Sequence, residues 1–324
     1  MSIATGTTTL TAIPVIDVTG LGGSSAKKAT VAGEIRAACT GSGFFYITGH
    51  GIPPTLFEQL FQQSRAFFAL PLEQKDALAM SKWNCNRGYE PLRAQRLEAD
   101  APPDLKEGFQ IGVELPAGHP ALGYDTTNHG PNHWPSNMPE FKRIMEAYLG
   151  QMLRVSKLLM RGLARSLDLA EDYFDGFGDA PIATLRLLHY PPQPPNPAPN
   201  EKGCGAHTDW GAVTLLLQDA SGGLEVQARD GKWIPAPPIP GTLVINIGDL
   251  FARWTNNLYH STMHRVINRS GRDRYSVPFF FDGPSDYRVS CIPTCLKVGE
   301  SPLFQEITVK GHLDDMMRRT YGTH

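Results

Sequence analysis

The sequence predicts an α+β protein with a mainly β core, in which a helical N-terminal portion supports a C-terminal β-barrel or jelly roll. One observation is the long segment Met138–Asp168, whose apolar residues recur at spacings of three and four and predict an amphipathic helix. A second is the series of short β-branched runs, separated by turn residues, that follows this helix. A third is the high content of Pro (27) and Gly (32), which is typical of short strands and loops rather than of long helices. Because neither half is self-sufficient, we expect them to fold together.

The N-terminal half is expected to mix strands and helices. The apolar run Ile13–Asp17 and the aromatic, β-branched run Gly43–Thr48 read as strands. Val31–Cys39 is expected to be helical, and Pro53–Leu70 has the apolar spacing of a helix. Residues 82–135 are rich in Gly, Pro and Asn, so we expect loops with short strands there.

The C-terminal half is expected to be built from short strands with turn signals between them. Pro191–Pro199 holds six prolines in nine residues and predicts an exposed loop. The expected strands are Thr184–Tyr190, Ala212–Gln218, Gly223–Val226, Leu243–Ile247 and Arg274–Phe281.

Composition excludes several classes of function. The formal net charge is −2, from 30 basic and 32 acidic residues without a block of one sign, which argues against a nucleic-acid or membrane-surface partner. The five cysteines are scattered without a CxxC pair, so neither a disulfide framework nor a zinc ribbon is expected, and a reducing, cytoplasmic location fits. Met1–Thr11 lacks the features of a signal peptide, and no stretch approaches the ~18 apolar residues of a membrane span.

Two potential metal ligands, His207 and Asp209, lie two residues apart near an expected strand end. On an extended segment such residues point to the same side with Cα atoms roughly 6.5–7 Å apart, so both can reach one ion. Two imidazoles and one carboxylate can hold an iron on one face and leave the other open for chemistry. If Leu258–Val266 is a strand, His260 and His264 share a face, and spacing alone leaves both as candidates for the second imidazole.

Arg274 and Ser276 share one face of the last expected strand. A guanidinium can bind a carboxylate through two hydrogen bonds, and a hydroxyl can add another donor. The apolar residues of Val277–Phe281 indicate that this strand is buried on at least one face. An inward Arg there needs an anionic partner, because an unpaired buried charge is very costly. A bound small carboxylate would supply that partner.

With their surroundings, these residues resemble the isopenicillin N synthase-like branch of the non-haem Fe(II)/2-oxoglutarate-dependent oxygenases. The resemblance extends over nearly the full length, and this combination of motifs in this order is highly specific. The motifs are Ile13–Asp17, Gly43–Ile47, Gly49–Ile52, Phe67–Pro71, Asn86–Tyr89, Asp104–Glu107, His189–Pro192, Ala206–Asp209, Asn246–Asp249, Trp254–Asn257, Ser261–Val266 and Arg274–Ser276.

The resemblance implies a double-stranded β-helix (jelly roll) with flanking helices. It implies one catalytic unit over residues 1–324. Within it we expect an N-terminal helical and mixed region at about 1–175, an Fe(II)/2-oxoglutarate jelly-roll core at about 180–290 and a C-terminal segment at 291–324.

The resemblance implies Fe(II) held by His207, Asp209 and His264, so that His264 rather than His260 is the distal ligand. It implies 2-oxoglutarate and dioxygen as co-substrates, with ascorbate as a candidate reductant. The reaction would hydroxylate, desaturate or cyclise a small-molecule metabolite and release succinate and CO2. We expect no nucleic-acid or membrane partner and a monomer or weak homo-oligomer.

The resemblance also implies a binding site for the co-substrate. Arg274 and Ser276 would bind the far carboxylate of 2-oxoglutarate. Tyr190 matches a tyrosine that often hydrogen-bonds the co-substrate. Many plant members carry Asn two residues before that tyrosine, whereas this chain has Leu188, so one auxiliary contact is missing.

Seven residues are candidates for substrate contacts. Four precede the long helix, in the region where members of the family build such contacts, and three are expected to face inward from strands. Arg87 could bind a substrate carboxylate or phenol, or could instead form a surface salt bridge. The seven candidates are Arg87, Tyr89, Arg93, Phe109, Thr214, Leu216 and Phe280.

Two other functions stay open at this point. One is an Fe(II) oxidase of the same fold that does not use 2-oxoglutarate, because isopenicillin N synthase and aminocyclopropane-carboxylate oxidase keep the Arg-x-Ser pair. Stoichiometric formation of succinate would distinguish the two. The other is a non-catalytic metal-binding or scaffold protein, against which the intact set of ligands argues.

Overall fold

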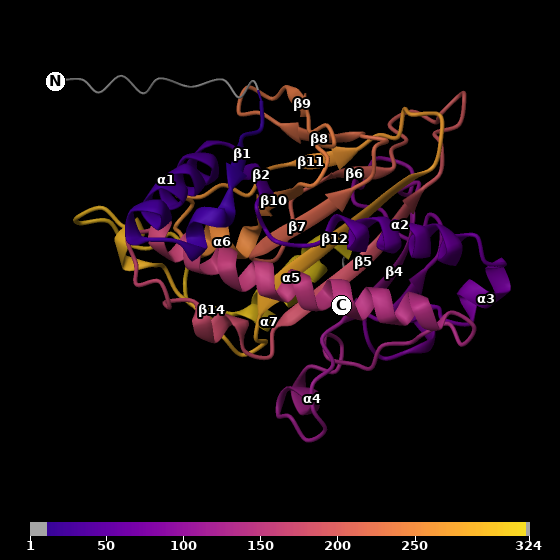
Figure 1. Cartoon of the computed structure of the whole chain (residues 1–324), viewed down its shortest axis with the longest axis horizontal. Coiled ribbons are helices and arrows are strands. Elements are labelled where there is room, and N and C mark those ends of the chain that lie inside the picture. The colour runs from indigo at the N-terminus through magenta and orange to yellow at the C-terminus, as the bar shows by residue number, and fades with distance from the viewer. Residues whose placement is uncertain (1–11, 322–324) are drawn as a thin grey trace.

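The computed structural model describes residues 12–321 (Figure 1). The segment Met1–Thr11, in which we expect no signal peptide, lies outside these residues. Two packed β-sheets form the centre, and helices cover the outer face of the larger sheet. Within residues 12–321, no helix is both long enough and apolar enough to cross a membrane.

The larger sheet contains eight strands, which are β1 (Val15–Asp17), β2 (Phe44–Thr48), β3 (Gly88–Glu90), β4 (Glu107–Gly112), β5 (Ile182–Tyr190), β7 (Val213–Gln218), β10 (Leu243–Ile247) and β12 (Arg274–Gly283). Their order is β1-β2-β10-β7-β12-β5-β4-β3. The β1–β2 pair is parallel, and the other pairs are antiparallel. Neighbours in space are therefore often distant in sequence, as in a jelly roll.

The smaller sheet contains β6 (Cys204–His207), β8 (Leu224–Gln227), β9 (Trp233–Pro235) and β11 (His264–Val266), in the order β6-β11-β8-β9. A separate pair consists of β13 (Arg288–Val289) and β14 (Ile307–Thr308). Phe44 and Leu188 of the larger sheet share one buried cluster with Leu224 and Val266 of the smaller one. The two sheets thus pack face to face and form a double-stranded β-helix, as expected.

The helices are α1 (Ser25–Gly41), α2 (Pro54–Phe68), α3 (Leu72–Asp76), α4 (Ala121–Tyr124), α5 (Pro139–Ser166), α6 (Asp249–Trp254) and α7 (Val309–Tyr321), with 3-10 turns at Val18–Gly22, Met80–Lys82, Asp175–Gly178 and Pro293–Cys295. The long helix α5 packs against α1 and α2 (Figure 1). Its stripe, which includes Phe141, Met145 and Met152, is buried as the spacing predicts.

The central strands alternate between two environments, because successive side chains of a strand point to opposite faces. Leu215, Phe279 and Phe281 belong to the core beneath the helices. Leu216, next to Leu215 on β7, and Phe280, between Phe279 and Phe281 on β12, face a cavity between the two sheets. The helices thus support one face of the sheet and leave the other for a binding site.

The elements differ from the expectation in two informative ways. The segment expected as a strand from Leu258 is extended only from His264 to Val266, so His260 lies outside β11. The imidazole of His260 contacts Arg229 instead of facing the cavity. The helices α6 and α7 and the short strand β6 were not anticipated, because α6 and β6 are too short to show a period and α7 is mostly polar.

Candidate active site

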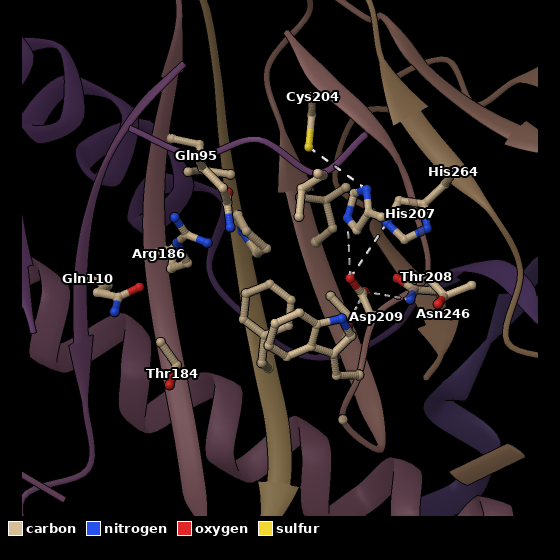
Figure 2. Close-up of a pocket in the computed structure, with 18 of the residues that line it drawn as sticks. Gln95, Gln110, Thr184, Arg186, Cys204, His207, Thr208, Asp209, Asn246 and His264 are labelled. Carbon is tan, nitrogen blue, oxygen red and sulfur yellow. Dashed lines mark hydrogen bonds and ion pairs between the residues drawn. The ribbon is translucent and has the colours of Figure 1, made fainter. Parts of the chain in front are cut away.

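The three expected metal ligands meet at the edge of the smaller sheet (Figure 2). Antiparallel pairing of β6 with β11 places His207 directly opposite His264, with ring centroids 4.2 Å apart. Asp209 follows two residues later, and its Oδ1 lies 3.6 Å from Nε2 of each imidazole. One ligand atom from each residue lies within 4.8 Å of the others, close enough for all three to bind one ion.

Backbone carbonyls fix the orientation of both imidazoles. Nδ1 of His207 lies 2.8 Å from the carbonyl oxygen of Gly205, and Nδ1 of His264 lies 3.1 Å from that of Thr262. A carbonyl only accepts, so each Nδ1 carries the proton and each Nε2 presents a lone pair toward Asp209. Hydrogen bonds of this kind hold the tautomer and ring angle of metal-binding histidines.

The carboxylate ligand is held in the same manner. Oδ2 of Asp209 accepts hydrogen bonds from the Thr214 hydroxyl at 2.6 Å and from the Asn246 amide at 2.7 Å. These bonds leave Oδ1 free to point between the imidazoles. Thr214, expected as a substrate contact, therefore holds the carboxylate of Asp209 in this structure. Figure 2 shows Asn246 beside Asp209.

The electrostatics of this cluster favour a cation. Burial lowers the pKa of His264 to about 4, and the charge of His207 adds to this effect. Burial alone would raise the pKa of Asp209, but His264, His207 and the Thr214 hydroxyl outweigh it and hold this pKa below its ordinary value. Burial opposes a raised pKa at His207, yet the charges of Cys204 and Asp209 raise it. A metal ion can replace the proton that this arrangement retains.

The donor set fits iron. Two imidazole nitrogens and one carboxylate oxygen on one side of an ion form the facial triad of mononuclear non-haem Fe(II) sites. Such a triad leaves coordination positions open toward the cavity.

A second site surrounds Arg274, whose side chain is fully buried. Its Nε donates to the carbonyl of Gly222 at 2.6 Å, and one terminal nitrogen donates to the Ser276 hydroxyl at 3.0 Å. The guanidinium also lies over the ring of Tyr190, 4.7 Å from the centroid. Within residues 12–321, its hydrogen-bond partners are neutral oxygens, the last being the Gln218 amide at 3.4 Å. A buried cation with neutral partners fits an anionic ligand.

One cavity of about 480 Å³ contains both the triad and Arg274. Strand register orders its wall into rows of cross-strand neighbours. Arg274 pairs with Tyr190 at one end of the cavity. Phe280 pairs with Thr184 on one side and with Thr214 on the other. The aromatic ring of Phe280 is thus the strand neighbour of the threonine that binds the carboxylate ligand.

Three of the seven expected substrate residues, Thr214, Leu216 and Phe280, line this cavity. The other four, Arg87, Tyr89, Arg93 and Phe109, are not among the residues that line it.

Each of these four residues has a different environment. Tyr89 donates to Glu107 at 2.6 Å, and Phe109 packs against the rings of Phe67 and Phe141 in the core. Arg93 pairs with Glu201 at 2.5 Å. Arg87 is buried and donates to the backbone carbonyls of Asn86 and Asn128, so its guanidinium is not part of a surface salt bridge. Periodicity could not reveal this, because loops surround most of these positions.

Other residues that line the cavity were not anticipated. Arg186 and Gln110 are cross-strand neighbours on β5 and β4 and face inward (Figure 2). The C-terminal helix α7 contributes Leu313 and Met317. A signal for Arg186 was present, because it is an arginine within a mostly apolar strand. No sequence signal placed α7 over the cavity, because that contact is tertiary.

A jelly roll that holds a His-x-Asp…His triad and a buried Arg in one cavity defines the class of mononuclear non-haem iron oxygenases and oxidases of this fold. Comparisons with known proteins agree. Residues 181–283 match the 2OG-Fe(II) oxygenase superfamily. Residues 13–137 match the N-terminal region described as non-haem dioxygenase in morphine synthesis.

Individual relatives cover nearly the whole chain. The 2-oxoglutarate-Fe(II) type oxidoreductase hxnY of Emericella nidulans is 43% identical over 96% of this chain and 91% of its own. T7H of Neurospora crassa, solved in complex with alpha-KG and thymine, has a TM-score of 0.83 at 32% identity and covers 95% of this chain and 97% of its own. JOX2, solved with 2OG, Fe and JA, has a TM-score of 0.77 at 29% identity, covering 96% and 86%.

The chain belongs to the 2-oxoglutarate/Fe(II)-dependent oxygenase family. It is an oxidoreductase that uses Fe(II) and 2-oxoglutarate. The prediction of a dioxygenase is thereby confirmed over an oxidase of the same fold that does not use 2-oxoglutarate.

Proposed function

We propose that His207, Asp209 and His264 hold the Fe(II), and that Arg274 with Ser276 binds the remote carboxylate of 2-oxoglutarate. The observation that carries this assignment is the fully buried Arg274 beside neutral oxygens, in the same cavity as the triad. A five-carbon diacid can join the two sites, because its keto-acid end would face the metal while its far carboxylate meets the guanidinium.

Each protein group then has a defined task. The carbonyls of Gly205 and Thr262 keep both imidazoles in the tautomer that presents Nε2. The ring of Tyr190 lies against the guanidinium, and its hydroxyl contacts Ser276, so this row closes the far end of the cavity. When bound, the iron with 2-oxoglutarate supplies activation of dioxygen by oxidative decarboxylation, which yields succinate and CO2. Burial of the site limits the access of water.

We propose that the substrate is a small planar ring, and the choice between hydroxylation, desaturation and ring formation depends on it. Phe280 offers a flat apolar face, and its strand neighbour Thr214 is hydrogen-bonded to Asp209. A ring packed on Phe280 would therefore lie next to the metal, since paired strands are about 5 Å apart. Arg186 and Gln110 add polar groups at the edge. The binding of thymine by T7H supports a ring of this size.

The wider properties of the protein follow as proposals. One catalytic unit over residues 1–324 is supported by a single core cluster that joins α1, α2 and α5 to the inner strands. The N-terminal region at about 1–175, the jelly-roll core at about 180–290 and the C-terminal segment 291–324 would be its parts. A cytoplasmic monomer or weak homo-oligomer without nucleic-acid or membrane partners is consistent with the net charge of −2 and free cysteines in the described part of the chain.

The co-substrate assignment is tested with Arg274→Gln and a matched surface control, Arg161→Gln. The guanidinium of Arg161 pairs with Asp175 outside the cavity. Losing a charge-assisted anchor of roughly 3 kcal/mol should raise the KM for 2-oxoglutarate about 100-fold. The control should leave it unchanged. An unaltered KM in a folded Arg274→Gln protein would contradict the assignment.

The iron assignment is tested by anaerobic addition of Fe(II) and 2-oxoglutarate. The unaltered protein should develop a weak visible charge-transfer band, and its aerobic turnover should release succinate. Asp209→Ala should lose both signals while it keeps its far-ultraviolet circular dichroism. Iron-dependent turnover that survives this substitution would show that the ligand assignment is mistaken.

A further inference from the structure

A carboxyl group occupies the end of the cavity opposite the co-substrate site. The inward positions of β12 are Arg274, Ser276, Pro278, Phe280 and Asp282, and all five line the cavity. The order along the strand is therefore an anion site, the aromatic face and then Asp282. This acid lies beyond Phe280 at the place where the proposed substrate ring would end.

The carboxyl of Asp282 occupies space that is free because position 211 is a glycine. Oδ1 of Asp282 accepts a hydrogen bond from the backbone N–H of Ala212 at 3.2 Å. A Cβ added to Gly211 would lie 1.5 Å from the same oxygen, so a side chain at position 211 and the present carboxyl position exclude each other. One main-chain N–H is a small share of what two carboxylate oxygens can accept.

No cation of the described residues neutralises Asp282. Burial raises the pKa of Asp282 to about 7, the Ala212 N–H opposes this effect, and the negative charge of Asp209 adds to it. A carboxyl in this condition gains most from a hydrogen-bond donor that a bound molecule brings.

The other charged groups of the cavity have partners or an assigned ligand. Lys106 forms a buried ion pair with Asp104 at 2.5 Å. Arg186 pairs with Glu90. Arg274 is the proposed site of the 2-oxoglutarate carboxylate. After these pairings, Asp282 is the remaining uncompensated charge in the part of the cavity left for the substrate, outside the metal centre. This negative charge favours substrates with hydrogen-bond donors and disfavours anions.

We propose that Asp282 selects the substrate: its carboxylate accepts a hydrogen bond from a ring N–H or ring O–H, so the enzyme takes small, non-anionic, donor-bearing planar rings. The inference rests on the proposed function, because it assumes that the ring packs on Phe280 beside the metal. An anionic ring would be repelled by the carboxylate. A ring that lacks a donor would leave the carboxylate desolvated without compensation, a loss large enough for strong discrimination.

The test uses the holoenzyme with Fe(II) and 2-oxoglutarate at pH 8 and measures succinate release above the basal rate. The probes are matched rings: uracil and 2-pyridone as N–H donors, their N-methylated forms, phenol as an O–H donor with anisole as its partner, and benzoate as an anion. Donor-bearing rings should stimulate succinate release at least 10-fold more than their methylated partners and benzoate. The N–H and O–H pairs show which donor is preferred.

Two variants locate the selectivity. Asp282→Ala should abolish the preference for donors, and Asp282→Asn, which keeps the shape and the oxygen that faces Ala212, should reduce it. Asp314→Asn is the matched control, because Asp314 also lines the cavity but is half-exposed and bonded to Lys310 at 2.7 Å. This control should keep the preference of the unaltered enzyme.

The outcomes separate the two proposals. Equal stimulation by methylated rings or benzoate, absence of stimulation by any donor-bearing ring, or a donor preference that persists in both folded Asp282 variants would overturn the inference. In each of these cases the unaltered enzyme still releases succinate from 2-oxoglutarate. Failure of the proposed function would instead appear as no succinate and no anaerobic visible band in the unaltered protein.

Discussion

Replacing Asp282 with Asn should change the pH dependence of stability in a direction that the structure determines. Burial is the main cause of the raised pKa of this carboxyl, which is about 7 in the folded protein against 3.8 for an unperturbed Asp. Below pH 4 both the folded and the unfolded chain carry the proton, so the group has no effect on the free energy of unfolding. Between the two values the folded chain holds a proton that the unfolded chain has released, so stability falls as pH rises, and the loss is complete above pH 7.

The size of the effect follows from the same shift. Each pH unit in this window changes the free energy of unfolding by about 1.4 kcal/mol, so pH 5 and pH 8 should differ by about 3 kcal/mol for this single group. Asn cannot ionise and keeps an oxygen for the Ala212 N–H. The Asp282→Asn protein should therefore be more stable relative to the unaltered protein at pH 8 than at pH 5, by about 3 kcal/mol.

Urea unfolding of metal-free protein, followed by tryptophan fluorescence at both pH values, measures this difference. Asp314→Asn serves as a control, because that carboxyl is half-exposed and paired with Lys310 on the surface of α7. A difference between Asp282→Asn and unaltered protein that is the same at pH 5 and pH 8 would refute the reasoning, since it would mean that Asp282 titrates alike in both states.

Three further predictions test other parts of the structure. Gly211→Ala should destabilise the protein by about 2–3 kcal/mol through overlap with Asp282, and Asp282→Gly should recover most of this loss in a double-mutant cycle of urea unfolding; additive effects would contradict the overlap. Arg87→Met should lower the free energy of unfolding by about 2–4 kcal/mol. It should also raise the KM of a stimulating substrate more than that of 2-oxoglutarate, because Arg87 holds the carbonyl of Asn128 at the cavity wall. An equal rise in both KM values would argue against this positioning role. Asp249→Asn should leave iron binding intact in equilibrium dialysis, since this acid bonds Thr208 rather than facing the triad, and loss of iron would show a ligand role.

The long helix and the central strands could be predicted because their signals are local. The apolar stripe of α5 is read directly from spacings of three and four, and the burial of β12 from its apolar run Val277–Phe281. His207 and Asp209 could be paired for the same reason, since the side chains of residues two apart on an extended chain point to the same side. Spacing could not choose between His260 and His264, and only the resemblance of the surrounding motif to a known family favoured His264.

The substrate side of the cavity could not be predicted in the same way. Arg87 and Arg186 are both charged residues near aromatic or apolar neighbours, and composition does not tell which one faces inward. Arg87 follows a loop whose path determines its direction, and it points into backbone carbonyls. Arg186 lies on β5, whose register against β4 and β12 places it in the cavity wall.

The sequence by itself therefore determined the class of fold, the faces of its long elements and the candidate residues of the proposed iron and carboxylate sites. The tertiary structure alone decided which strands are neighbours, and so it brought Phe280 beside Thr214, added α7 to the cavity wall and left Asp282 without a cationic partner among residues 12–321. The physical reason is that periodicity specifies the direction of a side chain relative to its own element. What the side chain meets there depends on the pairing of segments that lie far apart in the chain.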